Sequence, residues 1–221
     1  MIMVSPFSVF EHIHEVDAIV NTINTKGYMG KGLALEFALR FPKMEEAYKK
    51  ACQQGIIKPG SVWVYQLEAE YWEDVKAKRE RKRKFLNVLN AATKDDFKLP
   101  SKMEWIESIV DEIKDMLIRD EIQAVALPKL GAGLGKLQWE AVEEVIVTRL
   151  YELDKKIIIS LDLLAGEREK LAIELAMREF GGGLFEEPQK KIEMKIRRFR
   201  EFLSLEGVGK KRYSELVSKY F

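Results

Sequence analysis

The sequence predicts a three-layer α/β/α protein with a mixed, mostly parallel sheet and a small C-terminal helical appendage. Short apolar runs bounded by breaker residues alternate with longer amphipathic stretches along most of the chain. Of the 221 residues, 47% are hydrophobic and 10% aromatic, which supplies enough apolar surface for a packed core. Lys and Arg total 37 against 36 Asp and Glu, so the protein is neither wholly basic nor wholly acidic.

The candidate strands are short runs rich in β-branched and aliphatic residues. They span residues 16–21, 61–66, 85–90, 122–128 and 155–163. Apolar residues at helical spacing predict helices between them, at residues 32–40, 43–54, 101–118, about 137–153 and 167–180. Ser101 is expected to open the third helix, because Glu104 follows it at the spacing of a capping box.

The run Phe180–Pro188 indicates a boundary near the C-terminal end of the main domain. It contains three consecutive glycines followed by acidic residues, a composition that ends helices and separates units. We therefore expect a main domain over residues 1–165, a helix with a Gly-rich linker over 166–185, and a basic helical hairpin over 186–221. This last segment holds ten Lys and Arg and six Glu, and it is too short to form much core alone.

The sequence offers neither a disulfide framework nor a complete set of metal ligands. Cys52 is the only cysteine, and the only histidines are His12 and His14. We expect an inert, partly buried thiol at Cys52 and no metal or other cofactor. The N-terminal residues lack the pattern of a signal peptide, and no long apolar stretch is present, so we expect a cytoplasmic protein without membrane contact.

Two strand-to-helix connections are rich in glycine. The first lies within residues 20–37 and the second within residues 126–142. Glycines let backbone amides approach a ligand closely, and the start of the following helix favours an anion. Such loops at the carboxyl ends of strands in one open sheet bind phosphorylated ligands, and two of them together indicate a diphosphate. For the first loop, a turn that only connects its neighbours is the alternative.

The order of these segments resembles that of a macrodomain, specifically the DNA ADP-ribosyl glycohydrolase (DarG-type) antitoxin branch. The resemblance covers about residues 8–150. It rests on DAIVNTINTKGYMGKGLALEF, FPKMEEAYKKACQQGIIKPGSVWVYQ, a strand that ends in TK, and LPKLGAGLGKLQWEAV. It implies a metal-independent enzyme that removes ADP-ribose from a nucleobase on single-stranded DNA, with thymine as the expected base. It also implies a DNA-modifying ADP-ribosyltransferase toxin as a partner.

The resemblance also implies roles for individual residues. Lys94 and Asn24 match the catalytic positions, with Asn24 contacting the distal ribose and Lys94 acting on the bond between ADP-ribose and the base. The other expected ADP-ribose-binding residues are Asn21, Thr25, Gly27, Met29, Gly30, Lys31, Gly32, Thr93, Leu130, Gly131, Ala132, Gly133, Leu134 and Gly135.

The chemistry of Lys94 has more than one interpretation. Cleavage of an N-glycosidic bond develops positive charge on the ribose and negative charge on the departing base, so a fixed cation stabilises the transition state. A partly desolvated lysine could instead serve as a nucleophile or a proton carrier. A third interpretation is an exposed cation that only accompanies Asp95 and Asp96.

The chain departs from the macrodomain pattern at several places. The resemblance predicts an acidic residue shortly after the first strand that binds the adenine amino group, but residues 5–11 offer only Glu11 as a weak substitute. After Lys94 the chain continues Asp95-Asp96-Phe97-Lys98, where this branch has a basic, aromatic segment. The tail is also shorter than the toxin-neutralising region that follows such macrodomains.

Two basic segments are candidates for DNA binding. Residues 76–84 carry seven cations and one Glu, and we expect a cationic loop there, with Tyr71 and Trp72 available to stack on bases. Residues 202–216 resemble one helix-hairpin-helix unit. The alternatives are a solvated charged face for the first segment and, for the second, a hairpin that docks its apolar face on the main domain. The DNA-binding candidates are Lys82, Arg83, Lys84, Lys210, Lys211 and Arg212.

Two rival functions remain open at this level. One is a binding module that recognises ADP-ribose or ADP-ribosylated nucleic acid without cleaving it. The other is hydrolysis of small ADP-ribose derivatives, for which the basic segments would have no use.

Overall fold

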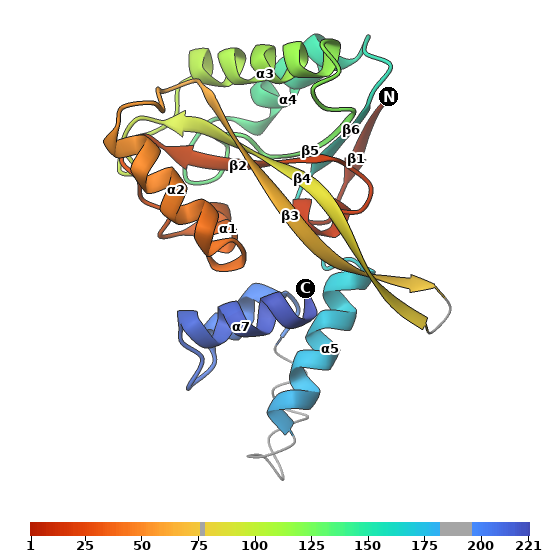
Figure 1. The fold of residues 1–221 in the computed structure, drawn as a ribbon. Coiled ribbons are helices and arrows are strands. Elements are labelled where there is room, and N and C mark those ends of the chain that lie inside the picture. Colours follow the sequence, from red (N-terminus) through yellow and green to blue (C-terminus); the bar gives the residue numbers. More distant parts are fainter. Residues whose placement is uncertain (76–77, 182–195) are drawn as a thin grey trace.

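A mixed six-stranded sheet in the order β1-β6-β5-β2-β4-β3 forms the middle layer of the protein (Figure 1). The computed structural model describes residues 1–75, 78–181 and 196–221, with the backbone alone over 68–75, 78–84 and 180–181. The strands are β1 (Ile2–Ser5), β2 (Ala18–Asn24), β3 (Val62–Val75), β4 (Lys78–Lys94), β5 (Ala124–Pro128) and β6 (Lys156–Ser160). Neighbouring strands are parallel except for β3, which is antiparallel to β4. The predicted mixed, mostly parallel sheet is confirmed.

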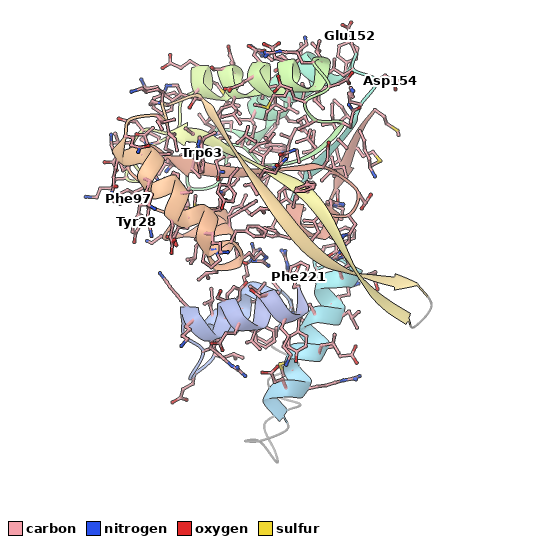
Figure 2. The ribbon with its side chains drawn as sticks, in the orientation of Figure 1. Tyr28, Trp63, Phe97, Glu152, Asp154 and Phe221 are labelled. Carbon is pink, nitrogen blue, oxygen red and sulfur yellow. The ribbon has the colours of Figure 1, made fainter. Side chains whose placement is uncertain are left out.

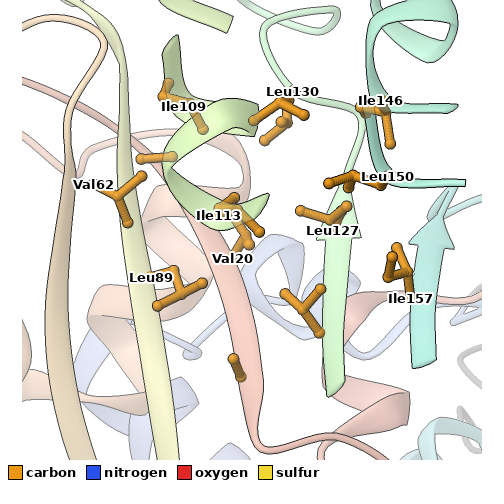
Figure 3. Packing of buried hydrophobic residues seen from close by; sticks show 14 of the residues in the cluster. Val20, Val62, Leu89, Ile109, Ile113, Leu127, Leu130, Ile146, Leu150 and Ile157 are labelled. Carbon is orange, nitrogen blue, oxygen red and sulfur yellow. The ribbon is translucent and has the colours of Figure 1, made fainter. Parts of the chain in front are cut away.

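Helices cover both faces of this sheet (Figure 1). Helices α3 (Met103–Ile118) and α4 (Trp139–Leu150) pack on one face, and α1 (Gly32–Arg40) and α2 (Pro42–Gln53) on the other. Because side chains alternate along a strand, Val20 packs in the α3–α4 layer (Figure 3) and its neighbour Ile19 in the α1–α2 layer. No helix in the described part of the chain is long and apolar enough to span a membrane.

Three local expectations are wrong, and each for a physical reason. β1 was not predicted, because it is a four-residue edge strand with Val4 58% exposed, too short to show an alternating pattern. Residues 78–84 are not a loop but part of β4, paired with residues 69–75 of β3; an antiparallel ladder satisfies its own backbone hydrogen bonds. Ser101 does not cap α3, whose N-cap is Lys102, because the Ser101 amide donates to the Gly135 carbonyl at 2.9 Å.

The C-terminal segment, residues 196–221, docks on the main domain. It contains a short 3₁₀ helix, η2 (Phe199–Ser204), and helix α7 (Lys210–Tyr220), which pack against α5 (Glu167–Gly181) and α1. This is the alternative predicted for residues 202–216, in which the hairpin docks its apolar face on the main domain. The cluster consists of Leu39, Ala172, Ala176, Met177, Ile196, Phe199, Phe202, Val208, Tyr213, Leu216 and Val217. The expected boundary at residue 186 and most of the Gly-rich linker lie outside the described residues.

A buried polar contact fixes α7 on α1. The Tyr213 hydroxyl donates to Oε2 of Glu36 at 2.6 Å, and Arg40 Nη1 donates to the same oxygen at 2.5 Å. The Ser214 hydroxyl donates to the Leu39 carbonyl at 2.6 Å. Burial raises the pKa of the Tyr213 phenol, so this group remains a donor to the carboxylate. The appendage is therefore held by directional bonds as well as by apolar packing.

Tyr213→Phe should lower the free energy of unfolding by about 2 kcal/mol, because it removes a buried hydrogen bond to a charged carboxylate. The matched control is Tyr151→Phe, which removes an exposed phenol–carboxylate bond of 2.9 Å to Glu152 and should cost less than about 0.5 kcal/mol. Urea denaturation of both variants measures the difference. Equal stability of the two variants would contradict the importance of this contact.

Candidate functional site

A cleft of about 780 Å³ lies over the carboxyl ends of β4, β2, β5 and β6. Ligands in open α/β sheets bind at this edge, because the loops that leave parallel strands meet there. Ten of the expected ligand-site residues line the cleft: Asn24, Gly30, Lys31, Gly32, Thr93, Lys94, Gly131, Gly133, Leu134 and Gly135. Six do not line it: Asn21, Thr25, Gly27, Met29, Leu130 and Ala132.

Asn24 organises the first glycine loop. Its Nδ2 donates to the Tyr28 carbonyl at 2.7 Å, while its Oδ1 accepts the Lys26 amide at 2.9 Å. The Tyr48 hydroxyl, buried beneath the loop, donates to the Asn24 carbonyl at 2.7 Å. The Asn24 amide is thus engaged within the chain, and it sets the path of the loop that borders the cleft.

Asn21 and Thr25 connect β2 and the loop after it to β4 and the chain that follows β4. Asn21 is fully buried and its Nδ2 donates to Oδ1 of Asn90 at 2.9 Å. The Thr25 hydroxyl donates to Oδ1 of Asp95 at 2.6 Å, and Lys26 forms a 2.9 Å ion pair with the same oxygen. These bonds hold the first glycine loop against the chain that follows β4.

The second glycine loop is shaped by a close backbone approach. A Cβ atom on Gly135 would lie 2.2 Å from the Gly131 carbonyl oxygen, so the loop requires glycine there. At Gly133, in contrast, a Cβ atom would meet nothing within 4 Å. The loop therefore closes on itself at its base and leaves its tip open to the cleft.

Lys94 ends β4 and reaches across the cleft to the second loop. Its Nζ donates to the Leu134 carbonyl at 2.6 Å and approaches the Phe97 carbonyl at 3.4 Å. Burial, together with the nearby charge of Lys136, lowers the pKa of the Lys94 ammonium. Asp95 is occupied by Thr25 and Lys26, so Lys94 is not simply its exposed companion.

Sequence reasoning missed an aromatic pair beside Lys94. The rings of Tyr28 and Phe97 are 4.7 Å apart, line the cleft, and are 52% and 42% exposed (Figure 2). They follow two different strands, and only the three-dimensional pairing of β2 with β4 brings them together.

The other end of the cleft was missed as well. Val9, Leu161 and Leu163 line it, together with Asp162 after β6 and Arg200 from the appendage. Glu11, the weak substitute for an adenine-binding acid, does not line the cleft. Its carboxylate accepts the amides of Arg168 and Glu169 at 2.8 and 3.1 Å at the start of α5, which is a helix-capping role.

Of the expected DNA-binding residues, Lys210, Lys211 and Arg212 do not line the cleft. The side chains of Lys82, Arg83, Lys84, Tyr71 and Trp72 are outside the described part of the structure. Lys210 and Lys211 are exposed on the first turn of α7. Arg212 forms ion pairs with Glu179 at 2.5 Å and Glu215 at 3.3 Å, so its charge is engaged within the appendage.

A resident metal would need a ligand set that the described residues do not supply. No group of three or more His, Cys, Asp or Glu side chains is placed to share an ion within residues 1–75, 78–181 and 196–221. Burial raises the pKa of the Cys52 thiol, which does not line the cleft.

Comparison with known proteins places this fold in one family. The macro domain family model matches residues 20–146. The solved macrodomain of Mycobacterium tuberculosis DarG has a TM-score of 0.60 and 32% identity, covering 72% of this chain and 97% of that one. The chain belongs to the macrodomain family, and within that family it is similar to the macrodomains of DarG proteins.

Curated relatives carry a specific activity in their names. A DNA ADP-ribosyl glycohydrolase of Thermus aquaticus is 37% identical over 146 residues, covering 63% of this chain and 35% of that protein. The protein of that name from Mycobacterium tuberculosis is 36% identical over 141 residues, covering 63% and 36%. This chain therefore spans about a third of the length of these relatives. The solved DarTG of Thermosipho africanus, in complex with ADP-ribose, has a TM-score of 0.62 and 26% identity, covering 72% and 41%.

Gly133→Glu should weaken ADP-ribose binding more than about 100-fold, because it puts a carboxylate at the open tip of the second loop, where the diphosphate is expected. Gly133→Ala is the matched control and should bind within about threefold of wild type, since its Cβ meets nothing. Isothermal titration calorimetry gives both affinities. Normal ADP-ribose binding by a folded Gly133→Glu variant would show that the diphosphate does not bind at the tip of this loop.

Proposed function

We propose that this protein is an ADP-ribosyl glycohydrolase that removes ADP-ribose from a nucleobase on single-stranded DNA, and that this base is thymine. The observation that carries the proposal is the position of Lys94, a lysine of lowered pKa at one end of a cleft bordered by two glycine loops. The names of the DNA ADP-ribosyl glycohydrolase relatives support the choice of reaction and of DNA as the substrate. No step requires a metal or another cofactor.

The order of the strands sets the direction of the ligand. The cleft crosses the ends of β6, β5, β2 and β4, a span of about 14 Å at the usual strand spacing. The glycine loops leave the two middle strands, so the diphosphate belongs in the middle, among their backbone amides. The distal ribose and the base then lie at the Lys94 end, and the adenosine lies beyond β6.

The reaction needs a proton for the departing base. The bond between the ribose C1″ and the base nitrogen breaks with its electron pair leaving on the nitrogen, and a water oxygen bonds to C1″. The Lys94 ammonium stabilises the developing negative charge and gives its proton to the nitrogen; the proton lost by water returns to the lysine through solvent. A lysine of lowered pKa is a better proton donor than an ordinary one, and backbone carbonyls hold it in place.

Lys94→Ala should lower kcat about 10²–10⁴-fold on a single-stranded oligonucleotide carrying one ADP-ribosylated thymine, and leave ADP-ribose affinity nearly unchanged. Lys94→Arg keeps the charge but cannot release a proton, so it should be nearly as slow. Lys102→Ala, an exposed lysine outside the cleft, should behave as wild type.

The pH profile tests the same assignment. The protonated lysine is the active form, so kcat should fall as pH rises through the Lys94 pKa, and that midpoint should lie below the usual lysine range. A rate that instead rises through this midpoint would make Lys94 a nucleophile or base. Tight binding of the modified oligonucleotide by wild type, without any release of ADP-ribose, would show that the protein is a binding module rather than an enzyme.

The aromatic pair suits the nucleic-acid part of the substrate. Tyr28 and Phe97 flank the Lys94 end with partly exposed rings, and Lys98 Nζ lies 5.6 Å from the Phe97 ring centroid. A base stacked on an aromatic side chain contributes about 1–3 kcal/mol without regard to sequence. We assign to this pair the base that neighbours the modified one.

Phe97→Ala should weaken binding of the ADP-ribosylated oligonucleotide about tenfold, through loss of one stacking surface, and leave free ADP-ribose affinity unchanged. Phe85→Ala is the control, because Phe85 is 62% exposed on β4 and does not line the cleft. Fluorescence anisotropy with catalytically impaired Lys94→Ala as background gives the affinities. Equal losses for ADP-ribose and oligonucleotide would place Phe97 against ADP-ribose itself.

The proposed cellular setting follows from the same relatives. A Thermosipho africanus relative is named as a DNA ADP-ribosyl transferase–DNA ADP-ribosyl glycohydrolase fusion protein and is 31% identical over 146 residues. We propose that this protein acts in the cytoplasm and reverses the product of such a DNA-modifying transferase.

A further inference from the structure

The end of the cleft beyond β6 holds an ion-paired cluster built from two distant parts of the chain. Asp162 follows β6 and is the one acidic side chain among the described residues that line the cleft. Its Oδ1 is paired with Arg198 Nη2 and its Oδ2 with Arg200 Nη1, both at 2.5 Å. Each oxygen of this carboxylate is thus held by a separate guanidinium group.

The two arginines belong to the C-terminal appendage, well beyond the residues 20–146 that match the family model. Arg198 is buried, and it also pairs with Glu169 at 3.0 Å and donates to the Asp162 carbonyl at 2.9 Å. Arg200 is more exposed and itself lines the cleft. Docking of the appendage therefore completes one wall of the cleft and fixes the acidic group in it.

The chemistry of this end suits a purine that carries an amino group. Val9, Leu161 and Leu163 supply apolar surface for a flat base. A carboxylate is an acceptor only and has about four lone-pair positions, so two ion pairs leave Asp162 able to accept a further N–H. A carboxylate oxygen is the acceptor that an exocyclic amino group needs, and the two ion pairs fix the position of this one.

We propose that Asp162 accepts a hydrogen bond from the amino group of adenine, and that Arg200 is the positioning residue that holds its carboxylate toward the cleft. This inference rests on the proposed function, which places the adenosine at this end. The appendage is then a part of the ligand site rather than only a DNA-binding or stabilising attachment.

The test compares ADP-ribose with its hypoxanthine analogue, inosine diphosphate ribose, which has a carbonyl oxygen in place of the amino group. Wild type should bind ADP-ribose about tenfold more tightly than the analogue, as expected for one hydrogen bond to a charged group. Arg200→Ala should bind ADP-ribose about tenfold more weakly and lose most of this preference. Arg197→Ala is the matched control, because Arg197 is exposed and lies outside the cleft.

Asp162→Asn is the second variant, and it keeps the backbone, since asparagine tolerates the φ of +57° at this position. An amide can accept from the amino group or donate to the carbonyl, so the preference should shrink to within about threefold. Thermal unfolding of each variant verifies that it is folded. Wild type that binds both nucleotides equally, or Arg200→Ala that keeps both affinity and preference, would overturn the inference.

Failure of this inference can be distinguished from failure of the proposed function, because the binding measurements use free ligands and need no turnover. A clear preference for ADP-ribose in a protein that never releases it from DNA would refute the hydrolase and support the adenine site. Lys94-dependent release of ADP-ribose from DNA, by a protein that binds both free nucleotides equally, would support the hydrolase and refute the adenine site.

Discussion

The alignment of the carboxyl ends of β6, β5, β2 and β4 along one edge of the sheet is the constraint on which the site depends. These strands are parallel, so each delivers its following loop to the same edge. The order β6-β5-β2-β4 differs from the order along the chain, and it sets segments from four regions of the sequence side by side. The two layers of helices bury the faces of the sheet and leave the edge formed by these carboxyl ends open.

Local features of the site could be predicted from the sequence, because they depend on neighbours along the chain. The glycine loops follow strands and precede helices, so their place at the sheet edge followed from the pattern alone. The pattern alone ended the preceding strand at residue 90, and the family resemblance extended it to Lys94, where β4 does end. The pattern did not separate residues that line the cleft from residues that do not: Asn21 and Met29 belong to the same run as Gly30, yet both are buried and neither lines the cleft.

The features that could not be predicted arise from contacts between distant segments. Tyr28 meets Phe97 because β2 pairs with β4, and Asp162 meets Arg200 because the appendage docks on α1 and α5. Ser101 carried a local capping signal, but its amide bonds to Gly135 in another loop and the helix begins later. The charge of residues 78–84 argued for a loop, but their backbone continues the antiparallel ladder with residues 69–75.

In the proposed reaction, the second glycine loop couples diphosphate binding to the position of Lys94. Gly135 and Gly131 approach so closely that the loop has one compact path, and on that path the Leu134 carbonyl points at Lys94 Nζ. Backbone amides and the Leu134 carbonyl belong to the same few residues, so the loop proposed to bind the diphosphate also orients the Lys94 ammonium group. In the proposed reaction, a ligand that orders this loop through its diphosphate also places the proton donor against the departing base. Binding energy gained far from the scissile bond then contributes to the chemical step, which is how an enzyme converts recognition into rate.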